Sequence, residues 1–255
     1  YEKFDAPKLK VGRRSAEMIK YASNDFLALK ISYVNEIANL CETVGADVEE
    51  VTLGMGYDKR IGDYFLHAGI GYGGSCFPKD TKALSWLASF NDKEIRTVKA
   101  AIEVNDNQKL KLIKKAKKYY EDFLFLNVAV LGCTFKPGTD DLREAPSLIN
   151  VPLLLEDGAH VRIWDPVGTE NFKKQVPSEK IQYCQSIEDT IRGADICLIF
   201  TEWEEICNFD VNKYKQLMKH PIVLDGRNCY TLDQFEGTGV TYSSIGRKTV
   251  NDIEE

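Results

Sequence analysis

The sequence predicts an α/β protein made of an all-helical domain over residues 1–105 and a domain with a parallel β-sheet over residues 106–255. Apolar residues recur every three or four positions in the first part, as in a helix that packs along one face. In the second part, short apolar runs alternate with helix-like segments. A helix over about residues 96–120 is expected to link the two. The length of 255 residues suits two modest domains.

One long helix dominates the first part. Its apolar stripe contains Ile19, Ala22, Phe26, Leu29, Tyr33, Ile37, Leu40 and Val44. Gly45 is expected to end this helix, and Asp47, with Glu50 three residues on, predicts a capping box at the start of the next. A stripe of this length needs a cover. A second copy of the chain in a homodimer is one economical answer.

Four apolar runs in the second part are predicted to be buried strands, namely "NVAVLG" (127–132), "HVRIWDP" (160–166), "ADICLIFT" (194–201) and "PIVLDGR" (221–227). Strands that alternate with helices imply a parallel sheet covered on both faces. Ligands bind such sheets at the carboxyl ends of the strands, which makes this edge a candidate nucleotide site. The run "GCTFKPG" lacks the G-x-G-x-x-G spacing, so these residues alone do not identify a cofactor.

The stretch "GIGYGGSCFPKD" (69–80) surrounds Cys76 with glycines and charges. Pro78 suits the first turn of a helix, so Cys76 is expected at a loop-to-helix junction. A helix N-terminus and Lys79 favour the thiolate, which is the nucleophilic form. Asp80, one turn on, could position or deprotonate a water. The glycines would let backbone approach a ligand, and the alternative is a tight turn with an inert thiol.

Lys20 and Asn24 lie four residues apart and share a face of the long helix, away from its apolar stripe. An ammonium and an amide are good donors for a developing oxyanion. An ordinary solvated helix face explains the same two residues.

Composition excludes several classes of function. A net charge of −6 argues against nucleic-acid binding, and the longest basic cluster, residues 109–120, is interpreted as the solvated face of a helix. No apolar run is long enough to span a bilayer. Seven cysteines without a CxxC pair and three scattered histidines give no zinc pattern, so no metal is expected. Free thiols in this number indicate a reducing cytosol, hence a cytoplasmic protein.

Five stretches together resemble the UDP-glucose/GDP-mannose dehydrogenase family: "KYASNDFLALKISYVNEIANLCE", "DKRIG", "GYGGSCFPKD", "FKPGTDDLREAPS" and "DGRN". The resemblance extends in order over essentially the whole chain. Within the family, phenylalanine after the cysteine resembles the UDP-glucose 6-dehydrogenases, whereas GDP-mannose dehydrogenases usually carry leucine there.

The resemblance implies a central helical dimerisation domain followed by a Rossmann-like domain that binds a UDP-sugar. The family begins with an NAD-binding Rossmann domain that carries the G-x-G-x-x-G loop. This chain opens at "YEKFDAPKLK", close to where that domain would end. We therefore expect the N-terminal NAD domain to be absent here, and the chain alone to be inactive.

By the same resemblance, NAD would oxidise the C6 alcohol of UDP-glucose to a carboxylate in two hydride transfers. Cys76 would form a thiohemiacetal and then a thioester, which water hydrolyses. Lys20 and Asn24 would stabilise the charged oxygen, and Asp80 would serve the water.

The resemblance also assigns binding residues. Lys79 and Arg143 would contact NAD, and Arg60 would reach the neighbouring subunit's substrate site. The other substrate residues would be Phe65, His67, Ala68, Gly69, Ile70, Gly71, Tyr72, Gly73, Phe77, Phe135, Lys136 and Arg227. Three alternatives remain: a dehydrogenase of GDP-mannose or a UDP-N-acetylhexosamine, a non-catalytic UDP-sugar-binding dimer, and a cysteine hydrolase that uses His67.

Overall fold

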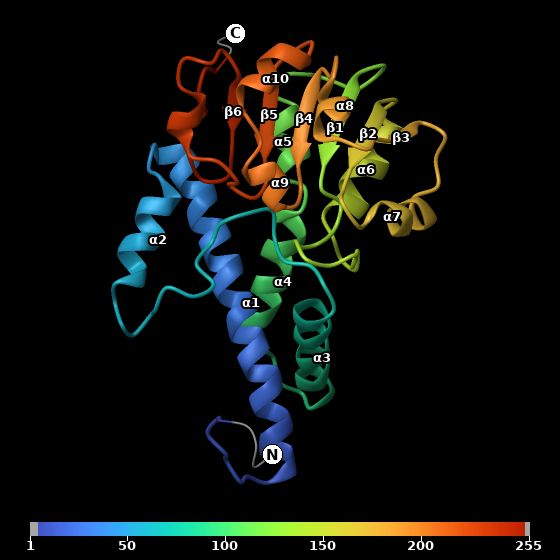
Figure 1. The fold of residues 1–255 in the computed structure, drawn as a ribbon. Helices are drawn as coiled ribbons and strands as arrows, with labels where there is room; N and C mark the ends of the chain where they lie inside the picture. The colour runs from blue at the N-terminus through green and yellow to red at the C-terminus, as the bar shows by residue number, and fades with distance from the viewer. Residues whose placement is uncertain (1–4, 253–255) are drawn as a thin grey trace.

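The computed structural model describes residues 5–252 and shows a helical half joined to a six-stranded sheet (Figure 1). Helix α1 (Arg13–Val44) runs from the N-terminal end of the molecule up to the sheet. Gly45 ends it with a φ of 76° and donates its N–H to the Cys41 carbonyl oxygen. Asp47 caps α2 (Val48–Gly56) as predicted, although its carboxylate accepts from the N–H of Glu49, 2.8 Å away, and not from Glu50.

Helix α1 packs inside the chain through a small and partly polar face. Its buried residues are Asp25, Ala28, Ser32, Val34, Asn35, Ala38 and Cys41, and α3 (Cys76–Phe90) and α4 (Arg96–Gln108) lie against it. The predicted apolar stripe lies largely elsewhere, because Phe26 is 63% exposed and Leu40 is 56% exposed. The stripe is therefore not the face that packs within this chain.

The linking segment forms α4 and then α5 (Lys111–Ala116), with a turn at residues 109–110 between them. Two lysines of the basic cluster are buried there. The Lys109 ammonium lies 2.8 Å from the Glu144 carboxylate, and that of Lys115 lies 2.9 Å from Glu42. The interpretation of residues 109–120 as a solvated face is wrong for these two.

The sheet is parallel throughout, in the order β3-β2-β1-β4-β5-β6. Its strands are β1 (Asn127–Leu131), β2 (His160–Trp164), β3 (Ile181–Tyr183), β4 (Ile196–Ile199), β5 (Ile222–Asp225) and β6 (Thr241–Ser243). The helices of this half are α6 (Ser147–Glu156), α7 (Thr169–Gln175), α8 (Ile187–Ile191), α9 (Glu204–Cys207), α10 (Asn212–Leu217) and the 3₁₀ helix η1 (Leu232–Phe235). The predicted parallel α/β sheet is confirmed.

Alternate strand residues feed two hydrophobic cores, one on each face of the sheet. Val128 and Val130 of β1 join the core that also contains Val34 of α1, whereas Ala129 and Leu131 face the core with Tyr214. The first core is shared by both halves, so the helical part and the sheet are packed together. Among residues 5–252, no helix is both long and apolar enough to cross a membrane.

Candidate functional site

Cys76 is the first residue of α3, at the predicted loop-to-helix junction. Ser75 precedes the helix, and Pro78 is buried in its first turn. The Cys76 side chain is exposed. The other six thiols are buried or half-buried: Cys41, Cys133, Cys184, Cys197, Cys207 and Cys229.

Lys20, Asn24 and Asp80 form one cluster between α1 and α3. One carboxylate oxygen of Asp80 accepts from the Lys20 ammonium at 3.1 Å and from the Asn24 amide at 2.5 Å. The ammonium of Lys79 lies 3.4 Å from the other oxygen. The three predicted catalytic neighbours of Cys76 are thus brought together, Lys20 and Asn24 from α1 and Asp80 from α3, one turn after the thiol.

Asp80 and the nearby Asp25 of α1 have opposite pKa shifts. Burial would raise the pKa of Asp80, but hydrogen bonds from Asn24 and Lys20 lower it below its ordinary value. Asp25, also on α1, has neither carboxyl oxygen hydrogen-bonded, and its burial and the nearby charge of Asp80 raise its pKa to about 6. Sequence reasoning missed Asp25, although an acidic residue on the buried face of a helix was the available signal.

The glycine-rich loop 69–74 is held by amide side chains of two helices. The N–H of Gly69 donates to Asn35 of α1 at 2.9 Å, and that of Tyr72 donates to Asn105 of α4 at 2.7 Å. The Gln108 amide donates to the carbonyl of Gly69 at 2.7 Å. These three polar residues were not singled out from the sequence, where they read as ordinary members of helical segments.

Close contacts with other parts of the protein also require glycine at positions in this loop. A Cβ at Gly73 would lie 2.7 Å from the Glu144 carbonyl oxygen, and one at Gly74, where φ is +78°, would lie 2.8 Å from the Phe135 ring. The sequence analysis explained the glycines by the approach of a ligand. The structure adds a reason: the loop is clamped between the helical half and the sheet.

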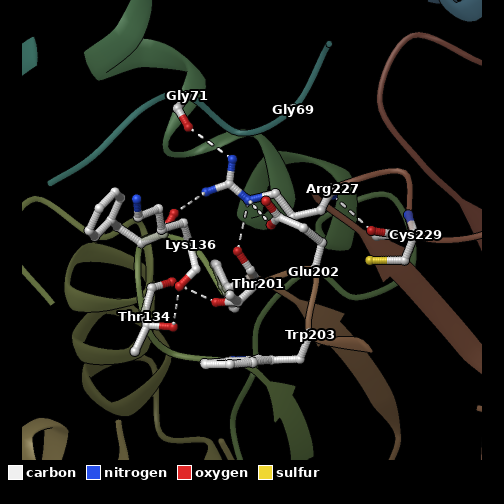
Figure 2. Close-up of polar contacts among 12 residues, drawn as sticks. Gly69, Gly71, Thr134, Lys136, Thr201, Glu202, Trp203, Arg227 and Cys229 are labelled. Carbon is white, nitrogen blue, oxygen red and sulfur yellow. Dashed lines mark hydrogen bonds and ion pairs between the residues drawn. The ribbon is translucent and has the colours of Figure 1, made fainter. Parts of the chain in front are cut away.

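Arg227, which follows β5, joins this loop to the carboxyl edge of the sheet (Figure 2). Its guanidinium donates to the carbonyl oxygens of Phe200 at 2.9 Å, Gly71 at 3.0 Å and Phe135 at 3.4 Å. The buried carboxylate of Asp225 accepts from the Arg227 N–H at 2.8 Å and so fixes the start of this segment. Sequence reasoning named Arg227 but missed this role of Asp225.

A cavity of about 690 Å³ opens between the loop, α1 and the sheet edge. Among the predicted substrate residues, His67, Ala68, Gly69, Gly71 and Arg227 line it. His67 therefore faces this cavity, whereas the neighbour of the Cys76 sulfur is the Ser75 hydroxyl, 4.0 Å away. A thiol–histidine pair is not built here, which counts against the cysteine hydrolase.

Three of the aromatic residues predicted to bind substrate cluster around Phe77, the residue that follows Cys76. The Phe77 ring meets the edges of Phe65 at 6.0 Å and Tyr72 at 5.7 Å between ring centroids. The Lys136 ammonium lies 5.4 Å above the Phe135 ring. The remaining loop residue, Ile70, donates its N–H to the Gly226 carbonyl oxygen at 3.0 Å.

A second hollow, of about 420 Å³, lies beside the N-terminus of α3. Both predicted cofactor residues, Lys79 and Arg143, line it, together with Lys82. Asp141 holds the Arg143 guanidinium through contacts of 2.9 and 2.7 Å. Glu144 lines the same hollow, with its carboxylate 2.9 Å from the Lys82 ammonium, so three cations and one carboxylate surround it.

Arg60 stands apart from these residues. It lies beyond α2 with its guanidinium exposed, and Asp58 holds it at 2.6 Å. It lines neither hollow. Within residues 5–252, no group of three His, Cys, Asp or Glu side chains is arranged to hold a metal ion.

The fold and these hollows define a two-part α/β protein, in which a helical half with an exposed thiol packs on a parallel sheet with a cavity at its carboxyl edge. The chain belongs to the UDP-glucose/GDP-mannose dehydrogenase family: residues 14–107 match the central domain of that family, and residues 129–232 match its UDP binding domain.

Individual relatives and solved structures are similar to this chain over most of its length. UDP-glucose 6-dehydrogenase YwqF of Bacillus subtilis is 48% identical over 98% of this chain and 57% of its own length. Among solved structures, a UDP-glucose dehydrogenase from Pyrobaculum islandicum matches 89% of this chain and 51% of its own length, with 36% identity and a TM-score of 0.82. An NDP-N-acetyl-D-galactosaminuronic acid dehydrogenase from Methanosarcina mazei matches 94% of this chain and 52% of its own, with 27% identity and a TM-score of 0.80. The chain thus spans about half the length of these relatives.

Proposed function

We propose that this chain supplies the catalytic thiol and the sugar-nucleotide site of an NAD-dependent UDP-glucose 6-dehydrogenase, which makes UDP-glucuronate. The observation that carries the proposal is the cluster of Lys20, Asn24 and Asp80, in which Asp80 lies one helical turn after the exposed Cys76. The similarity to UDP-glucose dehydrogenases favours UDP-glucose as the substrate. The galactosaminuronate relative keeps another sugar nucleotide as the second candidate.

In this proposal the cavity beside Arg227 holds the nucleotide and directs the sugar C6 toward Cys76. The thiolate adds to the C6 aldehyde as a thiohemiacetal, whose oxidation gives a thioester. Lys20 and Asn24 are within reach of the same carboxylate, so their donors can turn to a charged oxygen at C6. Asp80 accepts a hydrogen bond from the water that releases the acid.

When bound, NAD accepts the hydride from C6. Lys79, Lys82 and Arg143 would hold its phosphates in the hollow beside α3. Hydride transfer requires the two reacting carbons at near-attack distance, and such orientation contributes several orders of magnitude in rate. We therefore expect steady turnover only when the dinucleotide-binding domain typical of the family is joined to this chain.

Binding to this chain alone tests the substrate half of the proposal. Thermal shift and calorimetry are run with UDP-glucose, UDP-N-acetylgalactosamine, GDP-mannose and NAD, because a ligand that binds the folded state raises its melting temperature. We expect UDP-glucose to give the largest shift. A larger shift with GDP-mannose or with the N-acetylated sugar would identify that compound, and not UDP-glucose, as the preferred ligand. No shift with any sugar nucleotide would contradict the proposed binding site.

The catalytic half is tested in a chimera in which the dinucleotide-binding domain of YwqF precedes this chain. Cys76→Ser should slow formation of the acid by at least about 100-fold, because a serine hydroxyl is a much poorer nucleophile than a thiolate. A near-normal steady rate of NAD reduction in this variant would rule out the thioester route. Reduction of NAD in a chimera that carries native Cys76 is the required control.

We further propose a cytoplasmic homodimer formed through α1. The exposed apolar stripe of α1 supports the dimer, and the free thiols support a reducing compartment. In the dimer, Arg60, which lines neither hollow of its own chain, would serve the neighbouring subunit's site.

A further inference from the structure

Two thiols that the proposed chemistry does not use, Cys207 and Cys229, lie in the wall of the 690 Å³ cavity. Cys207 ends α9, in the connection that follows β4, and Cys229 lies four residues beyond the end of β5. Because β4 and β5 are paired neighbours in a parallel sheet, both connections leave the same edge. Both side chains line the wall of this one cavity, and each thiol is the largest influence on the pKa of the other.

The two thiols are chemically unequal. The neighbouring Cys229 thiol lowers the pKa of Cys207, whereas the Cys207 thiol and burial raise the pKa of Cys229. Both side chains are half-buried, so a small oxidant that enters the cavity can reach them. A thiolate with a thiol beside it is the arrangement of cysteines that form reversible disulfides.

We propose that Cys207 and Cys229 form a reversible disulfide when a peroxide oxidises the protein, and that this bond changes the sugar-nucleotide cavity. The Cys207 thiolate attacks a peroxide oxygen, the O–O bond breaks, and a sulfenic acid and one water result. The Cys229 sulfur then displaces the sulfenic oxygen as a second water. Two thiols are oxidised by two electrons in all, and hydrogen peroxide is reduced to two waters.

The effect on the cavity follows from what Cys229 is attached to, and it rests on the proposed function. The Asp225 carboxylate accepts from the N–H of Arg227 at 2.8 Å and from that of Cys229 at 2.6 Å, so this short segment is held at both positions by one side chain. An S–S bond is only about 2.05 Å long and demands a particular dihedral angle. Drawing Cys229 onto α9 strains the same segment from which Arg227 reaches across the cavity to Gly71.

Thiol mapping tests the disulfide directly. The Cys76→Ser chain is used so that the exposed thiol cannot link two molecules; it is oxidised with hydrogen peroxide, blocked with N-ethylmaleimide and digested. We expect one cross-linked peptide pair containing Cys207 and Cys229, reversed by dithiothreitol. Cys207→Ser and Cys229→Ser should each abolish it, and the matched control Cys184→Ser, which removes another half-buried thiol, should keep it.

Calorimetry with UDP-glucose on the reduced and oxidised chain tests the consequence. We expect oxidation to weaken binding by about fivefold or more, with recovery on reduction and no change in Cys207→Ser. Absence of the cross-link at oxidant levels that consume both thiols overturns the proposal, and a cross-link that leaves affinity unchanged overturns its effect on the cavity. If the reduced chain does not bind UDP-glucose, the proposed function fails, while the mapping still decides the disulfide.

Discussion

Lys20 and Asp80 are 60 residues apart in the chain, yet the ammonium of Lys20 lies 3.1 Å from the Asp80 carboxylate. The carboxylate is only 2% exposed, whereas the lysine side chain is 61% exposed. The pair therefore joins a buried anion on α3 to a cation that can still reach a ligand. Asn24 donates to the same oxygen. The Lys20 ammonium has three N–H donors and uses one of them here, so the others can turn to a reacting oxygen.

The first prediction concerns the reactivity of Cys76. Its side chain is exposed at the start of α3, whereas the other six thiols are at least half-buried. A limiting amount of iodoacetamide should therefore label Cys76 first, as mapped by mass spectrometry. Cys207 is the main competitor, because the neighbouring Cys229 thiol lowers its pKa. Faster labelling of Cys207 than of Cys76 would argue against Cys76 as the nucleophile.

The second prediction concerns Asp25. Its pKa is raised in the folded state to about 6 from an ordinary value of 3.8, so folding favours the protonated form. The folded protein gains nothing from this group when it is protonated in both states, and it loses stability as pH rises from about 4 through 6. Asp25→Asn cannot ionise, so that loss should vanish.

Urea unfolding at pH 4 and pH 8 measures this effect. The free energy of unfolding of Asp25→Asn, relative to the unchanged chain, should be higher at pH 8 than at pH 4 by about 1–3 kcal/mol, which corresponds to a shift of one to two pKa units. A fixed cost of burying the amide cancels in this comparison. Asp58→Asn is the control. Asp58 is a partly exposed carboxylate paired with Arg60, so its substitution should give no such rise. Equal differences at both pH values would mean that Asp25 does not titrate between them.

Much of the fold could be predicted from the sequence because its signals are local. Short apolar runs predicted β1, β2, β4 and β5, whereas the three-residue strands β3 and β6 carry too little pattern to detect. Pro78 and Gly45 predicted a helix start and a helix end for steric reasons that hold within one turn.

Pairings between distant segments could not be predicted in this way. Lys109 and Lys115 look solvated in sequence, and only the tertiary structure shows that they are buried and paired with Glu144 and with Glu42 of α1. The amide groups of Asn35 and Asn105 are likewise unremarked in sequence until the glycine loop is placed between their helices. Family resemblance named some residues that line the cavity, such as His67 and Arg227, but not Asn35, which lines the cavity and also holds its loop.

The third prediction separates backbone strain from crowding in the glycine loop. Gly74 and Gly138 have similar left-handed conformations, with φ of +78° and +75°. A Cβ at Gly74 would meet the Phe135 ring at 2.8 Å, whereas a Cβ at Gly138 would meet nothing within 4 Å. Gly138→Ala should therefore cost about 1 kcal/mol of stability from strain alone, and Gly74→Ala about 3 kcal/mol or more.

Chemical unfolding of the two variants measures this difference, and UDP-glucose titration shows whether the loop is coupled to the cavity. Gly74→Ala should also weaken UDP-glucose binding, because Phe135 and the loop must separate to admit the methyl group. Equal destabilisation by the two substitutions would show that the close contact with Phe135 relaxes without cost.

The fourth prediction concerns association through α1. The exposed stripe places Phe26, Leu40 and Val44 on the outside of a helix whose other face packs within the chain. Exposed apolar side chains in a row along one helix are typical of a helix that packs on a second copy. Two charges on the stripe, Phe26→Asp with Leu40→Asp, should repel their counterparts across a twofold axis and convert a dimer to a monomer.

Sedimentation velocity at micromolar concentration distinguishes the two states. Trp86→Asp is the matched control, because Trp86 is a large exposed apolar residue of α3, stacked on Phe90 and away from the stripe. It should leave the dimer intact, whereas the double variant should sediment as a monomer with an unchanged circular dichroism spectrum. If the unchanged chain is already a monomer, or if Trp86→Asp alone dissociates the dimer, the stripe of α1 is not the interface, and the proposed role of Arg60 in a neighbouring subunit's site fails with it.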